Sequence, residues 1–155
     1  LWNFISAHFS MITRVEGNTF TSEPLAFLFD DAEIQETISP YYMARIVDFQ
    51  QFIAQYPFKP DNNDHEWHFT LLDPIMECNQ GSFCLKIDKN GKGTATPISE
   101  ECPDQITIQT MTTMLMGYKR PCYLAKVGRL NTSEAIIDLL EDAIEQSEPY
   151  ISDYF

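Results

Sequence analysis

Alternating apolar and polar residues mark the middle third of the chain. Every second residue is apolar in residues 67–72 and again in residues 83–88, a period that is typical of strands with one buried face. The dipeptide Asn90-Gly91 follows the second stretch and favours a tight hairpin turn into a strand at residues 93–99. Together with a further strand at residues 105–109, this pattern predicts an antiparallel or mixed sheet.

A helical period precedes this region. Asp48 is followed by apolar residues at i, i+3, i+4 and i+7, which predicts a helix capped by Asp48 and stopped by Pro57. A polar loop is expected at residues 57–66, because this stretch is rich in Pro, Asp and Asn.

The last third of the chain is predicted to be helical. One helix follows Thr110 and ends at Gly117, and a short one opens at Pro121 and ends near Gly128. A final amphipathic helix begins near Asn131, where a capping-box-like pattern stands. Strands followed by helices indicate an α+β fold, with a sheet packed by helices.

The first part of the chain gives weaker signals. Residues 1–9 have helical spacing without a capping residue in front, so the chain is expected to start inside an element and to be part of a longer protein. Residues 9–15 and 42–47 are both predicted to be strands.

The net charge indicates which ligands the protein can bind. The 155 residues include 23 acidic and 10 basic side chains, a formal net charge of −13. Such a surface repels nucleic acid and anionic membranes and attracts cationic ligands. No apolar run approaches the roughly 20 residues that a membrane-spanning helix needs.

The four cysteines indicate the compartment: Cys78, Cys84, Cys102 and Cys122. They form no CxxC pair and the chain has no signal-peptide pattern, which predicts a reduced, cytoplasmic protein. We expect all four thiols to be buried as small apolar groups.

Two short segments contain residue types that could form a site. His65 and His68 would point to opposite faces of a strand, so they cannot share a metal ion, and no metal site is expected. The segment 88–93 lacks the ligands of a calcium loop. It also leads from strand to strand instead of into a helix N-terminus, so it is interpreted as a plain hairpin and not as a coenzyme loop.

The other candidates are apolar. A set of methionines and tyrosines at helical spacing is either core or the lining of an apolar-ligand pocket: Met111, Met114, Met116, Tyr118 and Tyr123. Residues 149–155 contain three aromatic side chains and an isoleucine. This tail either docks in a groove or places the terminal carboxylate at a site.

Several segments together resemble one enzyme family. They are residues 42–48 (YMARIVD), Phe52, residues 56–58 (YPF), Gly117-Tyr118, residues 128–130 (GRL) and residues 149–155 (PYISDYF). Their order and spacing are similar to the C-terminal part of Eis-like (enhanced intracellular survival) N-acetyltransferases of the GNAT family.

The resemblance implies a division of the chain. Residues 1–40 would be the remnant of a second acetyltransferase-like lobe, and residues 41–155 a sterol-carrier-protein-like domain. The first lobe, which holds acetyl-CoA in this family, is missing, so the chain should not be a complete enzyme by itself. The resemblance also implies that this N-terminal lobe is a partner and that the parent protein is a homo-oligomer.

The implied reaction is acetyl transfer to a primary amine of a cationic substrate, such as an aminoglycoside, a polyamine or a lysine side chain. The resemblance assigns the catalytic base to the α-carboxylate of Phe155. Tyr154 and Asp153 are expected at the substrate, where Asp153 would add negative charge. Two alternatives stay open: a module that binds apolar, lipid- or sterol-type ligands, and an oligomerisation domain.

Overall fold

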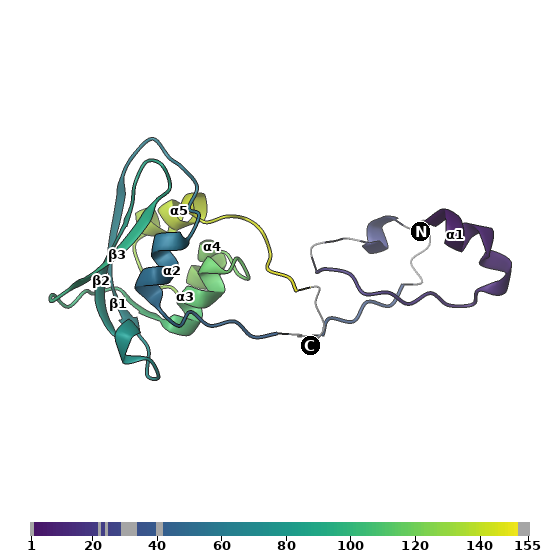
Figure 1. Cartoon of the computed structure of the whole chain (residues 1–155), viewed down its shortest axis with the longest axis horizontal. Coiled ribbons are helices and arrows are strands. Elements are labelled where there is room, and N and C mark those ends of the chain that lie inside the picture. The colour runs from purple at the N-terminus through teal and green to yellow at the C-terminus, as the bar shows by residue number, and fades with distance from the viewer. Residues whose placement is uncertain (1, 22, 24, 29–33, 40–41, 152–155) are drawn as a thin grey trace. The chain divides into compact units, whose positions relative to one another are not determined.

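The structure, a computed structural model, describes residues 2–21, 23, 25–28, 34–39 and 42–151. The chain divides into two units, Leu1–Pro40 and Tyr41–Phe155. Each unit is described by itself, and Figure 1 shows the elements of both.

The first unit contains short helices. Helix α1 (Trp2–Ala7) confirms the helix expected at the start of the chain, and 3-10 helices follow at Phe9–Met11 and Leu25–Leu28. The strand predicted at residues 9–15 is wrong. The backbone turns there, because the N–H of Met11 donates to the carbonyl of His8 at 2.9 Å, and no strand lies among the described residues of this unit.

The second unit is built on a four-stranded mixed sheet. Strand β1 (His65–Leu72) pairs antiparallel with β2 (Gly81–Ile87), and β2 pairs antiparallel with β3 (Gly93–Ile98). Strand β4 (Gln105–Thr107) pairs with β1 in parallel, so the strand order is β3-β2-β1-β4. Together with the helices of this unit, the sheet confirms the predicted α+β fold.

The hairpin between β2 and β3 is confirmed. Gly91 has a φ of +79°, and a Cβ atom at this position would lie 2.2 Å from the carbonyl oxygen of Phe58. The turn therefore requires glycine both for its backbone conformation and for the close passage of a neighbouring segment. That segment belongs to the predicted 57–66 loop, which ends at His65, where β1 begins.

The α-helices of the second unit lie on one side of the sheet (Figure 1). They are α2 (Phe49–Gln55), α3 (Ile108–Leu115), α4 (Pro121–Lys126) and α5 (Glu134–Ala143). The predicted alternation turns the apolar residues of β1 and β2 towards them. The ring of Phe49 meets Phe69 and Phe83 edge to face, with centroids 5.9 and 5.3 Å apart, and all three rings are buried. The interior between sheet and helices is thus filled by side chains.

The helix caps agree with the sequence in part. The carboxylate of Asp48 accepts the N–H of Gln51 at 2.9 Å, as its predicted capping role requires. Helix α5 begins later than predicted, because Ser133 and not Asn131 caps it and accepts the N–H of Ile136 at 3.4 Å.

The strand predicted at residues 42–47 is wrong, and its backbone shows why. The N–H of Ile46 donates to the hydroxyl of Thr112 at 3.3 Å. The side-chain amide of Asn79 donates to the carbonyl of Val47 at 3.1 Å and accepts the N–H of Phe49 at 2.9 Å. Since buried side chains satisfy these groups, the segment needs no partner strand.

Asp73 holds the same region from within. Its carboxylate, which is fully buried, forms an ion pair with Arg45 and accepts hydrogen bonds from Asn79 at 2.9 Å and from the N–H groups of Ile75 and Met76 at 3.0 Å each. Burial raises the pKa of Asp73, but the hydrogen bonds lower it by a larger amount. The net result is a pKa that falls from 3.8 to about 2. The carboxylate stays ionised because its oxygens are fully bonded.

Two further expectations are settled by the fold. Cys84 and Cys102 are buried, whereas Cys78 and Cys122 are exposed, so the prediction of four buried thiols is wrong for two of them. The exposed thiols lie outside the core, on the short 3-10 turn after β1 and on α4. No helix among the described residues is long and apolar enough to cross a membrane.

Candidate functional site

The predicted site residues Asp153, Tyr154 and Phe155 lie outside the described residues. The structure describes the segment that leads to them, residues 144–151, which leaves α5 without regular secondary structure. Its last side chains, Tyr150 and Ile151, are exposed. The geometry that bears on the predicted site is therefore the way in which the second unit holds the start of this tail.

Arg120 holds the end of α5. Its Nε donates to the carboxylate of Glu141 at 2.8 Å, and its Nη1 donates to the carbonyls of Ile144 and Glu145 at 3.2 and 3.1 Å. Ile144 and Glu145 directly follow Ala143, the last residue of α5, so the guanidinium bonds the carbonyls of the chain just past the end of the helix, where no helical partner is left for them. Arg120 therefore fixes the direction in which the chain leaves α5.

Glu141 connects Arg120 to α4. Its second carboxylate oxygen accepts the N–H of Cys122 at 2.7 Å, at the start of that helix. Burial raises the pKa of Glu141, but the bonds from Cys122 and Arg120 outweigh it, and the net pKa is lowered. The pair stays charged and joins α4, α5 and the tail.

Gly117 lets the tail pass close to the end of α3. It has a φ of +71°, and a Cβ atom here would lie 2.2 Å from the carbonyl oxygen of Ser147. A side chain would have to move the tail, so the passage requires glycine. The sequence predicted Gly117 as a helix end, which is confirmed, but did not indicate its contact with residue 147.

A shallow groove runs beside Arg120 and Glu141. It is lined by Gly117, Tyr118, Lys119, Arg120, Tyr123, Glu141, Gln146 and Glu148. The ammonium of Lys119 lies 4.6 Å from the centroid of the Tyr118 ring and 5.6 Å from that of Tyr123. Both tyrosines are exposed, whereas Met111 and Met114 are fully buried. The set of methionines and tyrosines therefore does not line one pocket: Met111 and Met114 belong to the core, and Tyr118 and Tyr123 lie at the surface.

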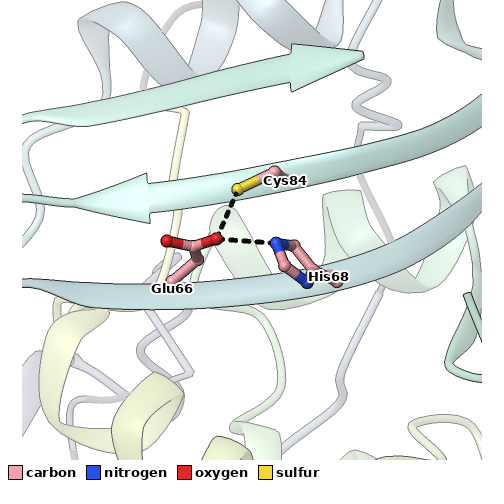
Figure 2. A group of neighbouring side chains, drawn as sticks. All are labelled: Glu66, His68 and Cys84. Atoms are coloured by element: carbon pink, nitrogen blue, oxygen red, sulfur yellow. Dashed lines mark hydrogen bonds and ion pairs between the residues drawn. The ribbon is translucent and has the colours of Figure 1, made fainter. Parts of the chain in front are cut away.

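A second cluster lies on the face of the sheet away from the helices. Figure 2 shows Glu66 and His68 side by side on β1 and Cys84 across from them on β2. Nε2 of His68 and Sγ of Cys84 lie 2.7 and 3.3 Å from the same oxygen of Glu66. The other oxygen of Glu66 lies 3.1 Å from Nζ of Lys86.

The order of these groups excludes a nucleophilic triad. In such triads an imidazole contacts the thiol and a carboxylate orients the imidazole. Here the carboxylate of Glu66 lies between the thiol and the imidazole. Burial and the hydrogen bond to Glu66 also raise the pKa of Cys84, which favours the neutral thiol.

Sequence reasoning missed this cluster because it tested only the pair His65 and His68. His65 instead lies 2.6 Å from a carboxylate oxygen of Asp61. The available signal was the spacing of Glu66 and His68, which share one face of a strand. The position of Cys84 opposite His68 depends on the register of β1 with β2, which an eight-residue connection leaves open.

Two family models match the chain. The model described as "Sterol carrier protein domain" matches residues 49–152. The model described as "Acetyltransferase (GNAT) domain" matches residues 1–46. No curated protein matches the chain.

Solved structures match as well. A conserved protein of unknown function from Enterococcus faecalis V583, described as a probable N-acyltransferase, is 28% identical with a TM-score of 0.84, over 98% of this chain and 39% of its own. A GCN5-related N-acetyltransferase from Anabaena variabilis ATCC 29413 is 23% identical, with a TM-score of 0.81, over 99% of this chain and 39% of its own. A GCN5-related N-acetyltransferase from Kribbella flavida is 24% identical, with a TM-score of 0.62, over 72% of this chain and 28% of its own.

The last two matches show the fold alone. The chain spans about two fifths of the length of the Enterococcus and Anabaena proteins.

Proposed function

The chain belongs to the sterol carrier protein domain family, and from this premise we propose that it is the C-terminal part of a longer, Eis-like N-acetyltransferase. The parent protein would transfer an acetyl group from acetyl-CoA to a primary amine of a cationic substrate. Aminoglycosides, polyamines and lysine side chains are the candidates. Residues 1–40 would be the end of a second acetyltransferase-like lobe, and residues 41–155 the domain that closes the chain.

The observation that carries this proposal is the order of the two matches along one chain. An acetyltransferase segment at residues 1–46 runs directly into the sterol carrier segment at residues 49–152. The Enterococcus protein described as a probable N-acyltransferase is similar over nearly the whole chain.

The coenzyme does not fit the described part of this chain. A pyrophosphate is usually held where a strand leads through a glycine turn into a helix N-terminus. The glycine turn at Asn90-Gly91 leads from β2 into β3 instead. We therefore assign acetyl-CoA to the N-terminal lobe of the parent, where it would supply the acetyl thioester.

The contribution of this chain would be its tail. We assign the role of base to the α-carboxylate of Phe155, which would take a proton from the substrate ammonium and leave a neutral amine able to attack. An ordinary α-carboxyl has a pKa of about 3.3 to 3.7, so partial desolvation or a relaying water must make it more basic. Asp153 and Tyr154 would line the same pocket, and Asp153 would add attraction for a cation.

Two features support this role for the tail. Arg120 and Gly117 fix where the tail leaves the second unit, which reduces the number of positions that its end can reach. The formal net charge of −13 favours the approach of a cationic amine.

The packing of the domain argues against the alternative of an apolar-ligand module. The space between sheet and helices is occupied by Phe49, Phe69 and Phe83, which are at most 2% exposed. A lipid-sized ligand would have to displace them. Cytoplasmic location and homo-oligomerisation of the parent stay predictions.

The first experiment compares acetyl-CoA consumption by this chain and by the longest natural protein that contains it, with aminoglycosides, polyamines and a lysine peptide as acceptors. We expect turnover in the longer protein alone. Turnover by this chain would contradict the assignment of the coenzyme site to another lobe. Inactivity of both with every amine would contradict the proposed reaction.

The role of the tail is tested in the longer protein by moving the carboxylate. Removing Phe155, or adding one glycine after it, should lower turnover severalfold and leave acetyl-CoA binding unchanged. Phe155→Ala is the matched control, since it keeps the carboxylate in place and removes only the ring. Equal turnover in all four proteins would exclude the carboxylate as the base.

A further inference from the structure

We propose that Glu66, His68 and Cys84 bind a single Zn²⁺ ion on the face of the sheet away from the helices. The proposal is independent of the acetyltransferase assignment, because it rests on side chains of β1 and β2 alone (Figure 2). It concerns a cluster that the proposed transfer reaction does not use.

The sheet brings the three donors together by its register. Glu66 and His68 are two residues apart on β1 and so project from the same face. His68 is paired directly with Cys84 on β2, and directly opposed side chains of an antiparallel pair are close neighbours. The site is therefore carried by two adjacent strands of a rigid sheet and not by a loop.

The distances fit one small cation. The ligand atoms of the three residues all lie within 4.8 Å of one another. Tetrahedral zinc with ordinary bond lengths to sulfur, nitrogen and oxygen places its ligand atoms ~3.3 to 3.7 Å apart. The present separation of 2.7 Å between His68 and Glu66 is shorter than that range, and the separation of 3.3 Å between Cys84 and Glu66 lies at its lower limit. Small side-chain rotations, without backbone movement, would admit the ion.

The donor types select the metal. A thiolate, an imidazole and a carboxylate together are the ligands of zinc, whereas calcium and magnesium prefer oxygen alone. Three protein ligands leave the fourth position of a tetrahedron to water. Glu66 and His68 are about half exposed at their side chains, at 46% and 53%, so this position faces solvent.

Lys86 orients the carboxylate. It is paired with Glu66 across the two strands and lies 3.1 Å from one carboxylate oxygen. The other oxygen is thereby turned towards both His68 and Cys84. Partners of this kind fix the direction of a metal ligand, and their loss typically weakens metal binding.

Binding exchanges protons for the ion. The thiol of Cys84 loses its proton to solvent and the thiolate forms the bond to zinc, while the imidazole of His68 offers the lone pair of one ring nitrogen and keeps its proton on the other. The carboxylate, which now accepts hydrogen bonds from both groups, turns the same oxygen to the metal. No oxidation or reduction takes place.

The test uses this chain with its two exposed thiols removed, as Cys78→Ser with Cys122→Ser, so that they cannot bind metal. Titration with Co²⁺ should produce a thiolate-to-cobalt charge-transfer band at one ion per chain, and Zn²⁺ should displace it with micromolar or tighter affinity. Cys84→Ser should abolish the band. His68→Gln, a change at an exposed side chain, should weaken Zn²⁺ binding at least about tenfold.

His65→Gln is the matched control. It removes a histidine of the same strand, but this histidine contacts Asp61 and not Glu66. We expect its affinity to equal that of the starting protein. Three results would overturn the proposal: no charge-transfer band before substitution, a band that survives Cys84→Ser, or equal loss in His65→Gln and His68→Gln. Circular dichroism of each variant confirms that the sheet is intact.

Discussion

Replacing Asp73 by asparagine tests the buried network that holds the segment before α2. The change keeps the shape of the side chain but removes its charge. One carboxylate oxygen accepts from Asn79 and the other from Ile75, Met76 and Arg45. An asparagine can replace only one of these acceptors, and its NH₂ group then faces a donor.

The expected magnitude follows from the lowered pKa. The interval between 3.8 in the unfolded chain and about 2 in the folded protein corresponds to about 2 kcal/mol of free energy of unfolding. Because the folded state binds the proton less tightly than the unfolded state, this contribution is complete above about pH 4. It declines as the pH falls from about 4 towards 2 and is absent below.

Asp73→Asn should therefore be less stable than the starting protein by at least about 2 kcal/mol at pH 7. The difference should shrink by about that amount on going to pH 2. Urea unfolding measured by the fluorescence of Trp67, which is buried, reports on this unit. Trp2→Phe removes the other of the two tryptophans.

Asp138→Asn is the matched control, since it makes the same chemical change at an exposed position on α5. Its effect should stay within about 0.5 kcal/mol at every pH. A stability difference for Asp73→Asn that is absent at pH 7, or that does not change with pH, would refute the reasoning from the network.

Three smaller predictions concern the tail and one helix start. Gly128→Ala should lower the free energy of unfolding by about 1 kcal/mol, because that glycine has a positive φ and open space around its Cβ position. Gly117→Ala should lower it clearly more, because a Cβ atom there also meets the Ser147 carbonyl. The same change should speed proteolysis of residues 146–151. Arg120→Met should cost about 2 to 3 kcal/mol in urea unfolding, since it leaves partly buried acceptors without a donor. Asp48→Ala should cost about 1 kcal/mol through the lost cap of α2.

Elements with strong local signals could be predicted from the sequence. The alternation along β1 and β2 fixed their buried faces, Asn90-Gly91 fixed the hairpin, and Asp48 fixed the start of α2. Each of these depends on residues within a few positions of one another. Local chemistry was sufficient there.

Features that depend on distant residues could not be predicted in the same way. Residues 42–47 have a strand-like composition, but Asn79 and Thr112, far along the chain, take the hydrogen bonds that a strand would form. The parallel direction of β4 depends on how the chain crosses the sheet after β3, which the sequence does not encode locally.

The candidate site divides along the same line. Glu66 and His68 share a face by simple spacing, but only the register of β1 with β2 adds Cys84. Gly117 is recognisable as a helix end, yet its contact with Ser147 joins segments 30 residues apart. The charge of Asp73 likewise depends on partners brought together by folding.

The two outer strands of the sheet have a consequence for aggregation. An exposed strand edge can pair with another chain and start a growing assembly. Here β3 carries Pro97, which has no N–H to donate, and β4 is only three residues long. Both edges thus offer an incomplete row of hydrogen-bonding groups. Strand addition between copies is disfavoured on either side, so this domain should resist edge-to-edge polymerisation at high concentration.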